Sequence, residues 1–235
     1  PSTTPSQKPT ALPSSRSPTQ YPTAEKASHS PSEIPSDWPS GSPTLAPTVS
    51  SSILELLRKV SGNIVITHPD APQFKAAQWL VQKDQLDYNV TAHQSQKLHQ
   101  RYALVALDFA FHENDETKLD WTDPEIDECF WDGVTCASFN GVDYVRTINW
   151  ARRDLTGTVS SEFSLLPALE TLDLAQNQLQ GTLDPFYPLK YLKNLYLFDN
   201  KLSGPIKDEI SNLHILERLY LGKNEITGTL PNGLW

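Results

Sequence analysis

The stretch Leu169-Glu-Thr-Leu-Asp-Leu174-Ala-Gln-Asn177-Gln-Leu179-Gln-Gly181-Thr-Leu183 shows the pattern that decides the fold. The pattern starts again at Leu192 and at Leu216, and a weaker copy starts at Val145. Its glycine recurs at intervals of 24, 23 and 24 residues, at Gly157, Gly181, Gly204 and Gly228. A fixed period in this range predicts a solenoid in which each copy forms one coil.

Each position of the pattern has a physical role. Leu172 and Leu174 alternate with polar neighbours, which is typical of a short strand whose leucines face the core. Asn177 follows three residues later, where its amide can pair with backbone groups left unbonded as the chain turns away. The equivalent residues of the other copies are Arg153, Asn200 and Asn224. Because one coil cannot bury its own leucines, we expect the four coils to stack.

These repeats resemble the plant-type leucine-rich repeat family, whose pattern is LxxLxxLxLxxNxLxGxIPxx. The resemblance implies an α/β leucine-rich repeat solenoid with a short parallel sheet on its concave side and a right-handed coil. It also implies that ligands bind on the concave face. Only Leu230-Pro231 keeps the family's apolar residue and proline, so the outer strand of each coil is less clearly predicted than the concave one.

The only two cysteines lie in Cys129-Phe-Trp131-Asp-Gly133-Val-Thr-Cys136, just before the first repeat. This segment resembles the cap signature that precedes the first coil in ectodomains of the same family. The resemblance implies a disulfide between Cys129 and Cys136, and hence an oxidising compartment. Trp121, Phe130 and Trp131 are expected to cover the open end of the first coil. A two-cysteine metal half-site is the alternative, but it lacks further thiols and well-placed histidines.

Three regions are expected: a disordered stalk over 1–50, a helical cap over 51–143, and four repeats over 144–235 that stop inside a repeat. Within the stalk, proline occupies every fourth position from Pro31 to Pro47. Such a Pro/Ser/Thr-rich chain favours an extended, polyproline-like and O-glycosylated spacer. The alternative interpretation is a ligand for aromatic grooves that bind proline. The chain has no methionine and is interpreted as a fragment.

Three helices are predicted in the cap. The first begins at the capping box Ser52-Ile-Leu-Glu55, and the second begins where Asp70 caps the turn that contains Pro72. The third follows the capping box Thr91-Ala-His-Gln94 and continues to Phe111. The sequon at Asn89, between the second and third helices, is a candidate N-glycosylation site.

The segment 113–128 is rich in Asp and Glu, but its spacing fits neither a calcium-binding loop nor a pair of catalytic carboxylates. We interpret it as an exposed loop and predict no metal and no cofactor. The net charge of −9 argues against a nucleic-acid partner. No apolar run is long enough to span a bilayer, so a membrane anchor would have to lie outside this fragment.

The residues expected to point outward from the concave strands give the candidate binding surface. They are Asn149, Asp173, Asn194, Tyr196, Phe198, Asp199, Arg218, Tyr220 and Lys223. Aromatic and arginine side chains on an exposed sheet are favoured anchors of interfaces. The sequence thus favours a non-catalytic extracellular or cell-surface recognition module that binds a protein, peptide or glycan. The alternatives are the ectodomain of a receptor-like kinase, and a wall-associated enzyme or inhibitor that acts on polysaccharide.

Overall fold

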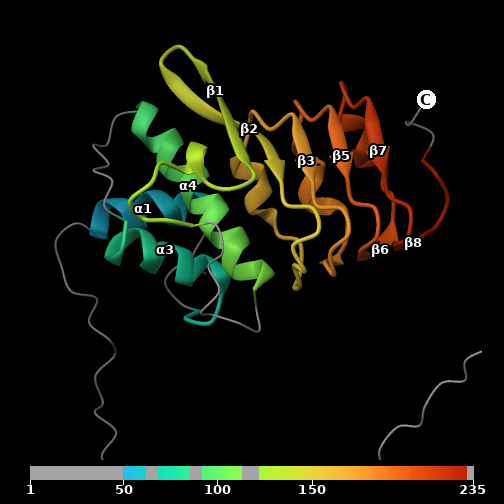
Figure 1. Cartoon of the computed structure of the whole chain (residues 1–235), viewed down its shortest axis with the longest axis horizontal. Coiled ribbons are helices and arrows are strands. Elements are labelled where there is room, and N and C mark those ends of the chain that lie inside the picture. Colours follow the sequence, from blue (N-terminus) through green and yellow to red (C-terminus); the bar gives the residue numbers. More distant parts are fainter. Residues whose placement is uncertain (1–49, 62–67, 85–91, 113–121, 232–235) are drawn as a thin grey trace, which may run out of the picture. The chain divides into compact units, whose positions relative to one another are not determined.

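The computed structural model describes residues 50–61, 68–84, 92–112 and 122–231, which lie within one compact unit, Ala46–Trp235 (Figure 1). Several expectations concern residues outside these ranges. They are the stalk over 1–49, the Asn89 sequon, the capping residue Thr91, the aromatic Trp121 and the acidic residues before 122. The described cap contains the helices α1 (Ser50–Ser61), α3 (Pro72–Gln82) and α4 (Ala92–Phe111).

The long helix predicted to end at Phe111 is confirmed by α4, but two predicted helix starts are wrong. Helix α1 begins at Ser50, so Ser52 lies within its first turn. Helix α3 takes Ala71 as its N-cap residue, without a side-chain hydrogen bond, and Asp70 lies one residue too early to cap it. Pro72 occupies the first turn as expected, because no carbonyl there needs its missing N–H.

Helix α4 forms the centre of the cap, and Arg101 lies fully buried within it. The guanidinium lies between the Trp79 and Trp131 rings, 5.5 and 4.5 Å from their centroids. It donates to Asp84 Oδ2 at 2.8 Å and to Glu128 Oε2 at 3.4 Å, and both of these carboxylates are also buried. Because a buried charge is tolerated only when it is paired, Arg101 joins α3, α4 and the acidic segment.

The interpretation of 113–128 as an exposed loop is therefore wrong at Glu128. Its side chain has no exposed surface, and it accepts a hydrogen bond from Gln100 Nε2 at 3.0 Å. Gln100 also donates to the carbonyl of Asp143 at 2.8 Å and accepts from the N–H of Val145 at 3.2 Å. Gln100 thus connects α4, the central helix of the cap, both with Glu128 at the end of the acidic segment and with the strand that contains Asp143 and Val145.

The cysteine segment forms η1 (Glu128–Phe130) and then a hairpin of β1 (Val134–Phe139) and β2 (Val142–Asn149). The disulfide between Cys129 and Cys136 is present. Phe130 does not cover the first coil as expected, because 81% of its surface is exposed. Trp131 is buried, but it packs against Trp79 and Arg101 inside the cap.

The four repeats form coils whose strands lie in two sheets (Figure 1). The concave sheet has the order β1-β2-β3-β5-β7, and it is parallel from β2 onward. Its repeat strands after β2 are β3 (Thr171–Asp173), β5 (Asn194–Tyr196) and β7 (Arg218–Tyr220). The less clearly predicted outer strands also form, as β4 (Gln180–Gly181), β6 (Lys201–Pro205) and β8 (Glu225–Thr227). The backs of the coils carry η2 (Ser161–Leu165), η3 (Asp184–Phe186) and η4 (Asp208–Asn212).

Leucines and asparagines hold each coil to its neighbour. Leu172 and Leu174 are buried, as are the equivalent Leu195 and Leu197 of the next coil. Asn200 Nδ2 donates to the carbonyls of Leu174 and Leu197, at 2.9 and 3.2 Å, and its Oδ1 accepts from the N–H of Leu179 at 3.0 Å. Asn177 and Asn224 form the same bonds one coil earlier and one coil later. The repeat glycines have φ between 80° and 105°, which a Cβ would strain.

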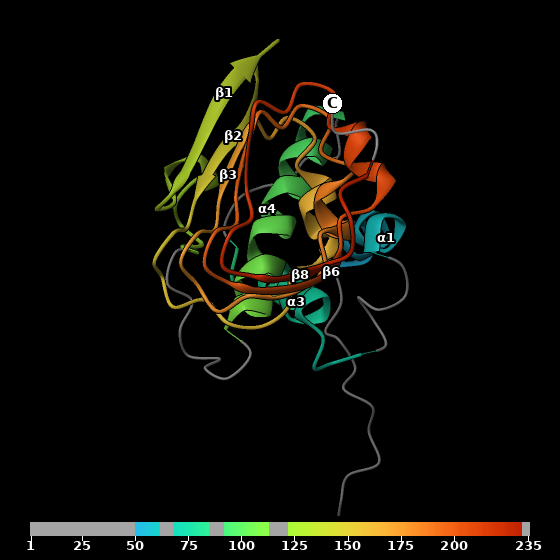
Figure 2. The same cartoon turned by 90° about the vertical axis from the view of Figure 1, so that its right-hand side faces the viewer.

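Helix α4, not the cysteine segment, covers the open end of the first coil (Figure 2). The ring of Phe111, at the end of α4, lies 6.4 Å from Trp150 and 6.3 Å from Phe163. Its carbonyl accepts a hydrogen bond from the N–H of Thr156 at 3.1 Å. Arg153, which replaces asparagine in this coil, donates to Asp132 at 2.6 Å and so connects the coil to the cysteine segment.

Candidate ligand-binding face

Outward side chains of the concave sheet lie in rows that run from coil to coil. The strand register places Thr147, Thr171, Asn194 and Arg218 in one row, and Asn149, Asp173, Tyr196 and Tyr220 in the next. Phe198, Asp199 and Lys223 follow at the carboxyl ends of β5 and β7. The structure therefore brings the sequence-predicted residues together on one surface, with the aromatic ones in the third and fourth coils.

The aromatic residues form a continuous patch, defined by Tyr196, Phe198 and Tyr220. The rings of Tyr196 and Tyr220 stack at 5.2 Å with an interplanar angle of 26°. Tyr220 is 53% exposed, and the other two rings are half-buried. The ammonium of Lys223 lies 4.9 Å from the centroid of Phe198, within the range of a cation–π contact. The patch thus offers large aromatic rings to a ligand. Contacts with each other and with Lys223 hold these rings in place.

Polar contacts order the residues around this patch. Arg218 Nη1 donates to Asn194 Oδ1 at 2.9 Å, and Asn194 Nδ2 donates to Thr171 Oγ1 at 3.0 Å. Asp173 accepts from the backbone N–H of Ala175 at 3.0 Å, so one of its oxygens shapes the turn after β3. Asn149 lies exposed at the end of β2. These side chains are arranged before any ligand arrives, which lowers the entropy that binding must remove.

A row of charged residues lies beside the amino-terminal ends of β3 and β5 in the same sheet. Glu170 accepts hydrogen bonds from Lys193 Nζ at 2.8 Å and from Arg146 Nη1. The hydrogen bond from Lys193 is the main cause that lowers the pKa of the Glu170 carboxyl, and the positive charge of Arg146 adds to it. Glu217 follows Lys193 in the same row, so positive and negative charges alternate from coil to coil.

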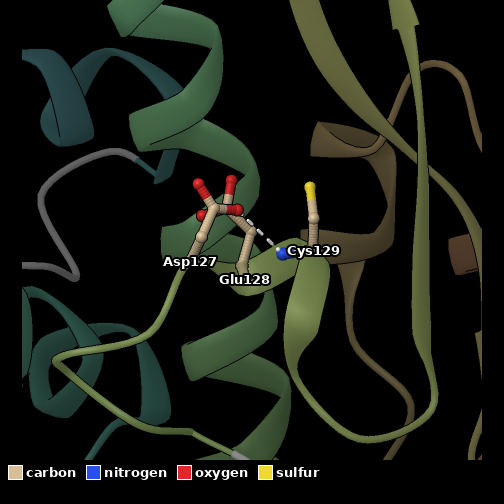
Figure 3. A group of neighbouring side chains, drawn as sticks. All are labelled: Asp127, Glu128 and Cys129. Atoms are coloured by element: carbon tan, nitrogen blue, oxygen red, sulfur yellow. Dashed lines mark hydrogen bonds between the residues drawn. The ribbon is translucent and has the colours of Figure 1, made fainter.

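Asp127, Glu128 and Cys129 lie close enough together to suggest a metal site (Figure 3). However, the sulfur and carboxylate oxygens that would bind a metal already have partners within the chain. Cys129 Sγ is in the disulfide, Asp127 accepts from Lys97 and from the N–H of Cys129, and Glu128 pairs with Arg101. Burial alone would raise the pKa of Asp127, but the hydrogen bonds from Lys97 and Cys129 outweigh it and lower the pKa. These three residues form a structural cluster in which side-chain cations neutralise the carboxylates.

One surface feature was not predicted from the sequence. An open groove of about 320 Å³ lies beside the β1–β2 hairpin, and its lining comes from three successive coils. The lining residues are Phe139, Tyr144, Arg146, Pro167, Ala168 and Tyr191. The hairpin itself had a signal, because Asn140-Gly141 favours a two-residue turn with both φ angles positive. The structure has φ of 51° and 77° there.

Comparisons with known proteins match both parts of this architecture. Residues 98–137 match the leucine rich repeat N-terminal domain, and residues 191–213 and 216–235 match the Leucine Rich Repeat. The first match covers most of α4 and the disulfide segment, and the second covers the third and fourth coils. Within the part of the chain that the structure describes, no helix is both long and apolar enough to cross a bilayer.

Curated relatives are receptor-like kinases of Arabidopsis thaliana. The chain is 33% identical over 98 residues to receptor-like kinase TMK4, covering 42% of this chain and 10% of the relative. It is 34% identical over 77 residues to a probable leucine-rich repeat receptor-like serine/threonine-protein kinase, covering 33% and 8%. The chain therefore spans about a tenth of the length of these relatives.

Among solved structures, the leucine-rich repeat ectodomain of the receptor kinase SOBIR1 from Arabidopsis thaliana is 28% identical to this chain. The match covers 53% of this chain and 66% of that one, with a TM-score of 0.44. The repeat pattern, the stacked coils and the family matches lead to one conclusion. The chain contains a leucine-rich repeat solenoid, and the segment that closes its N-terminal end matches the leucine rich repeat N-terminal domain.

Proposed function

We propose that this protein is a recognition module that binds a protein or peptide ligand on its concave face, outside the cell or at its surface. The observation that carries the proposal is the stacked pair Tyr196 and Tyr220 on an open sheet, next to Arg218. Tyrosine and arginine dominate the energetics of protein interfaces, since they bury much area and still donate hydrogen bonds. The proposal assigns no catalytic step to the chain.

The relatives support a more specific form of this proposal, in which the chain is part of the ectodomain of a receptor-like kinase. In this form the ligand-binding region lies here, and a membrane anchor and a kinase domain belong to other parts of the protein. The disulfide between Cys129 and Cys136 agrees with an extracellular location, because such bonds persist in oxidising compartments. A glycan ligand is the second possibility, and it would also use the flat tyrosine faces.

The test compares two variants of the full chain in two screens, one of a displayed random-peptide library and one of a printed glycan array. The double variant Tyr196→Ala with Tyr220→Ala should lose peptide binding by at least tenfold, while its circular dichroism stays unchanged. Phe130→Ala is the control, because it removes an even more exposed aromatic ring that lies outside the concave sheet. Peptides that bind the double variant as well as the wild type would refute the proposal. Hits in the glycan array alone would replace the peptide ligand with a sugar.

A further inference from the structure

Asp173 differs from the other charged residues of the candidate binding surface, because it has no counter-charge beside it. Arg218 Nη1 lies 3.7 Å from Glu217 Oε2, and Lys223 Nζ lies 3.6 Å from Asp199 Oδ2. Asp173 forms no salt bridge with any residue that the structure describes, although it is only half-buried. The second coil therefore presents an unpaired negative charge on the concave face.

One oxygen of Asp173 remains available to a ligand. Its Oδ1 accepts a hydrogen bond from the N–H of Ala175 at 3.0 Å, and its Oδ2 has no partner among the described residues. Arg152, in the turn after β2, donates to Gln176 Oε1 at 2.5 Å instead. A ligand could thus bind Oδ2 without breaking an existing ion pair.

An aromatic face lies next to this carboxylate. The strand register places Asp173 beside Tyr196, and Tyr196 beside Tyr220 (Figure 1). The tyrosine rings stack with centroids 5.2 Å apart, close to the spacing of about 4.8 Å between parallel strands, so they stack along the direction from coil to coil. Because Tyr220 covers one face of the Tyr196 ring, the opposite face is turned toward β3, the strand that carries Asp173.

Small residues lie next to Asp173, while the neighbouring aromatic ring leans away from it. The outward positions two residues after Asn149 and Asp173 are Ala151 and Ala175, and only in the third coil is this position aromatic, as Phe198. A Cβ on Gly222 would lie 3.3 Å from Cδ2 of Phe198, so this ring packs against the fourth coil. Little bulk therefore stands between solvent and the Asp173 carboxylate.

We propose that Asp173 and the free face of Tyr196 together bind an arginine or lysine side chain of the peptide ligand. This inference rests on the proposed function and specifies the chemistry of one ligand residue. A guanidinium donates in its own plane to a carboxylate while its face stacks on an aromatic ring, and an ammonium can also contact both groups.

The charge of the chain agrees with a cationic ligand. Lysine and arginine equal aspartate and glutamate in number over residues 1–50, so the whole net charge of −9 belongs to residues 51–235. An acidic surface raises the local concentration of cationic ligands and speeds their association. Asp173 would then give the bound peptide a fixed register, since it marks one position along the row of outward residues.

The experiment begins with the displayed random-peptide library. The library is depleted on the full chain with Tyr196→Ala and Tyr220→Ala and then selected on the wild type, so that the retained peptides depend on these tyrosines. The most abundant retained peptide is synthesised with a fluorescent label, and its affinity is measured by anisotropy. In further copies each arginine in turn is replaced by citrulline, or each lysine by acetyllysine, which removes the charge.

The retained peptides are expected to share a basic residue, and Asp173→Asn should weaken their binding about threefold or more. Asparagine keeps an oxygen that can accept from Ala175, so the turn after β3 should be preserved. Neutralising the shared residue should weaken binding to the wild type by a similar factor and leave binding to Asp173→Asn nearly unchanged. Asp208→Asn is the matched control, because it removes an exposed carboxylate from η4 on the back of the solenoid, and it should not change binding.

A loss of less than about threefold in Asp173→Asn, or one no larger than in Asp208→Asn, overturns this inference and leaves the proposed function standing. The same holds if the neutralised peptide loses the same factor on the wild type and on Asp173→Asn, since the two charges would then act independently. A library without any peptide that depends on the tyrosines contradicts the proposed function itself, and this inference with it.

Discussion

Asn200 gives the sharpest test of how the coils are held together, through the substitution Asn200→Ala. Its side chain is only 8% exposed and makes three hydrogen bonds to backbone groups of two coils. Alanine would leave the carbonyls of Leu174 and Leu197 and the N–H of Leu179 without these partners. All three groups lie where the coils pack, so water cannot simply replace the amide.

A buried backbone group without a partner costs about 1–3 kcal/mol, so the loss of three bonds should destabilise the fold by about 3–9 kcal/mol. This is a large share of the 5–15 kcal/mol that typically separates folded from unfolded domains. In a domain of this size it corresponds to a decrease in Tm of roughly 6–36 °C. The same change at Asn224 should cost less than half as much, because this asparagine is partly exposed and water can reach its partners.

The measurement is urea unfolding followed by far-UV circular dichroism and by tryptophan fluorescence, which reports on the buried Trp150 of the first coil. Asn212→Ala is the matched control, because Asn212 is an exposed asparagine in η4, and its loss should change stability by less than about 0.5 kcal/mol. The reasoning fails if Asn200→Ala destabilises the protein by less than about 1 kcal/mol, or no more than Asn224→Ala.

Three further predictions concern the cap. Arg101→Met should cost about 3–5 kcal/mol in urea unfolding, because it removes the buried guanidinium that pairs with Asp84 and Glu128, although Glu128 keeps Lys97 at 3.4 Å; a change below about 1 kcal/mol would contradict the buried ion cluster. Replacing Cys129 and Cys136 by serine should cost about 2–3 kcal/mol in thermal unfolding, and an unchanged Tm would show that the short loop needs no crosslink. Asp127→Asn should lower stability at pH 7, because a lowered pKa means that the carboxylate stabilises the fold when ionised. That difference should begin to shrink as the pH falls below the ordinary Asp pKa of about 3.9 and disappear once the pH passes the lowered pKa, and a constant difference in the urea midpoint from pH 7 to about 2.5 would refute it.

The coils could be predicted from the sequence because their determinants are local. Leucines two residues apart and an asparagine three residues later specify the strand and the turn within one repeat, and the period then specifies the stack. The same alternation predicted which side chains lie on the concave sheet. It could not predict that Tyr196 and Tyr220 stack at 5.2 Å or that Arg218 bonds to Asn194, since these contacts depend on the exact register between coils.

The cap was harder to predict because its decisive contacts join distant residues. Glu128 appears in a run of acidic residues that is typical of a solvated loop, yet it is buried against Gln100 and Arg101 on another helix. No local pattern around Arg101 shows that two tryptophans enclose it. The groove was missed for the same reason, because Tyr144, Ala168 and Tyr191 become neighbours only after the coils stack.

The turn after each concave strand contains a residue with a left-handed backbone that is not glycine. These residues are Arg152, Gln176, Asp199 and Lys223, with φ between 55° and 61°. A side chain in this region costs roughly 1 kcal/mol or more relative to glycine, and the fold bears this strain once in every coil. In return, Arg152 reaches Gln176 at 2.5 Å and Lys223 lies 3.6 Å from Asp199. The solenoid thus carries a row of charged and amide side chains along the turns that follow its concave strands. Glycine in these turns would give a less strained backbone, but it would remove this row.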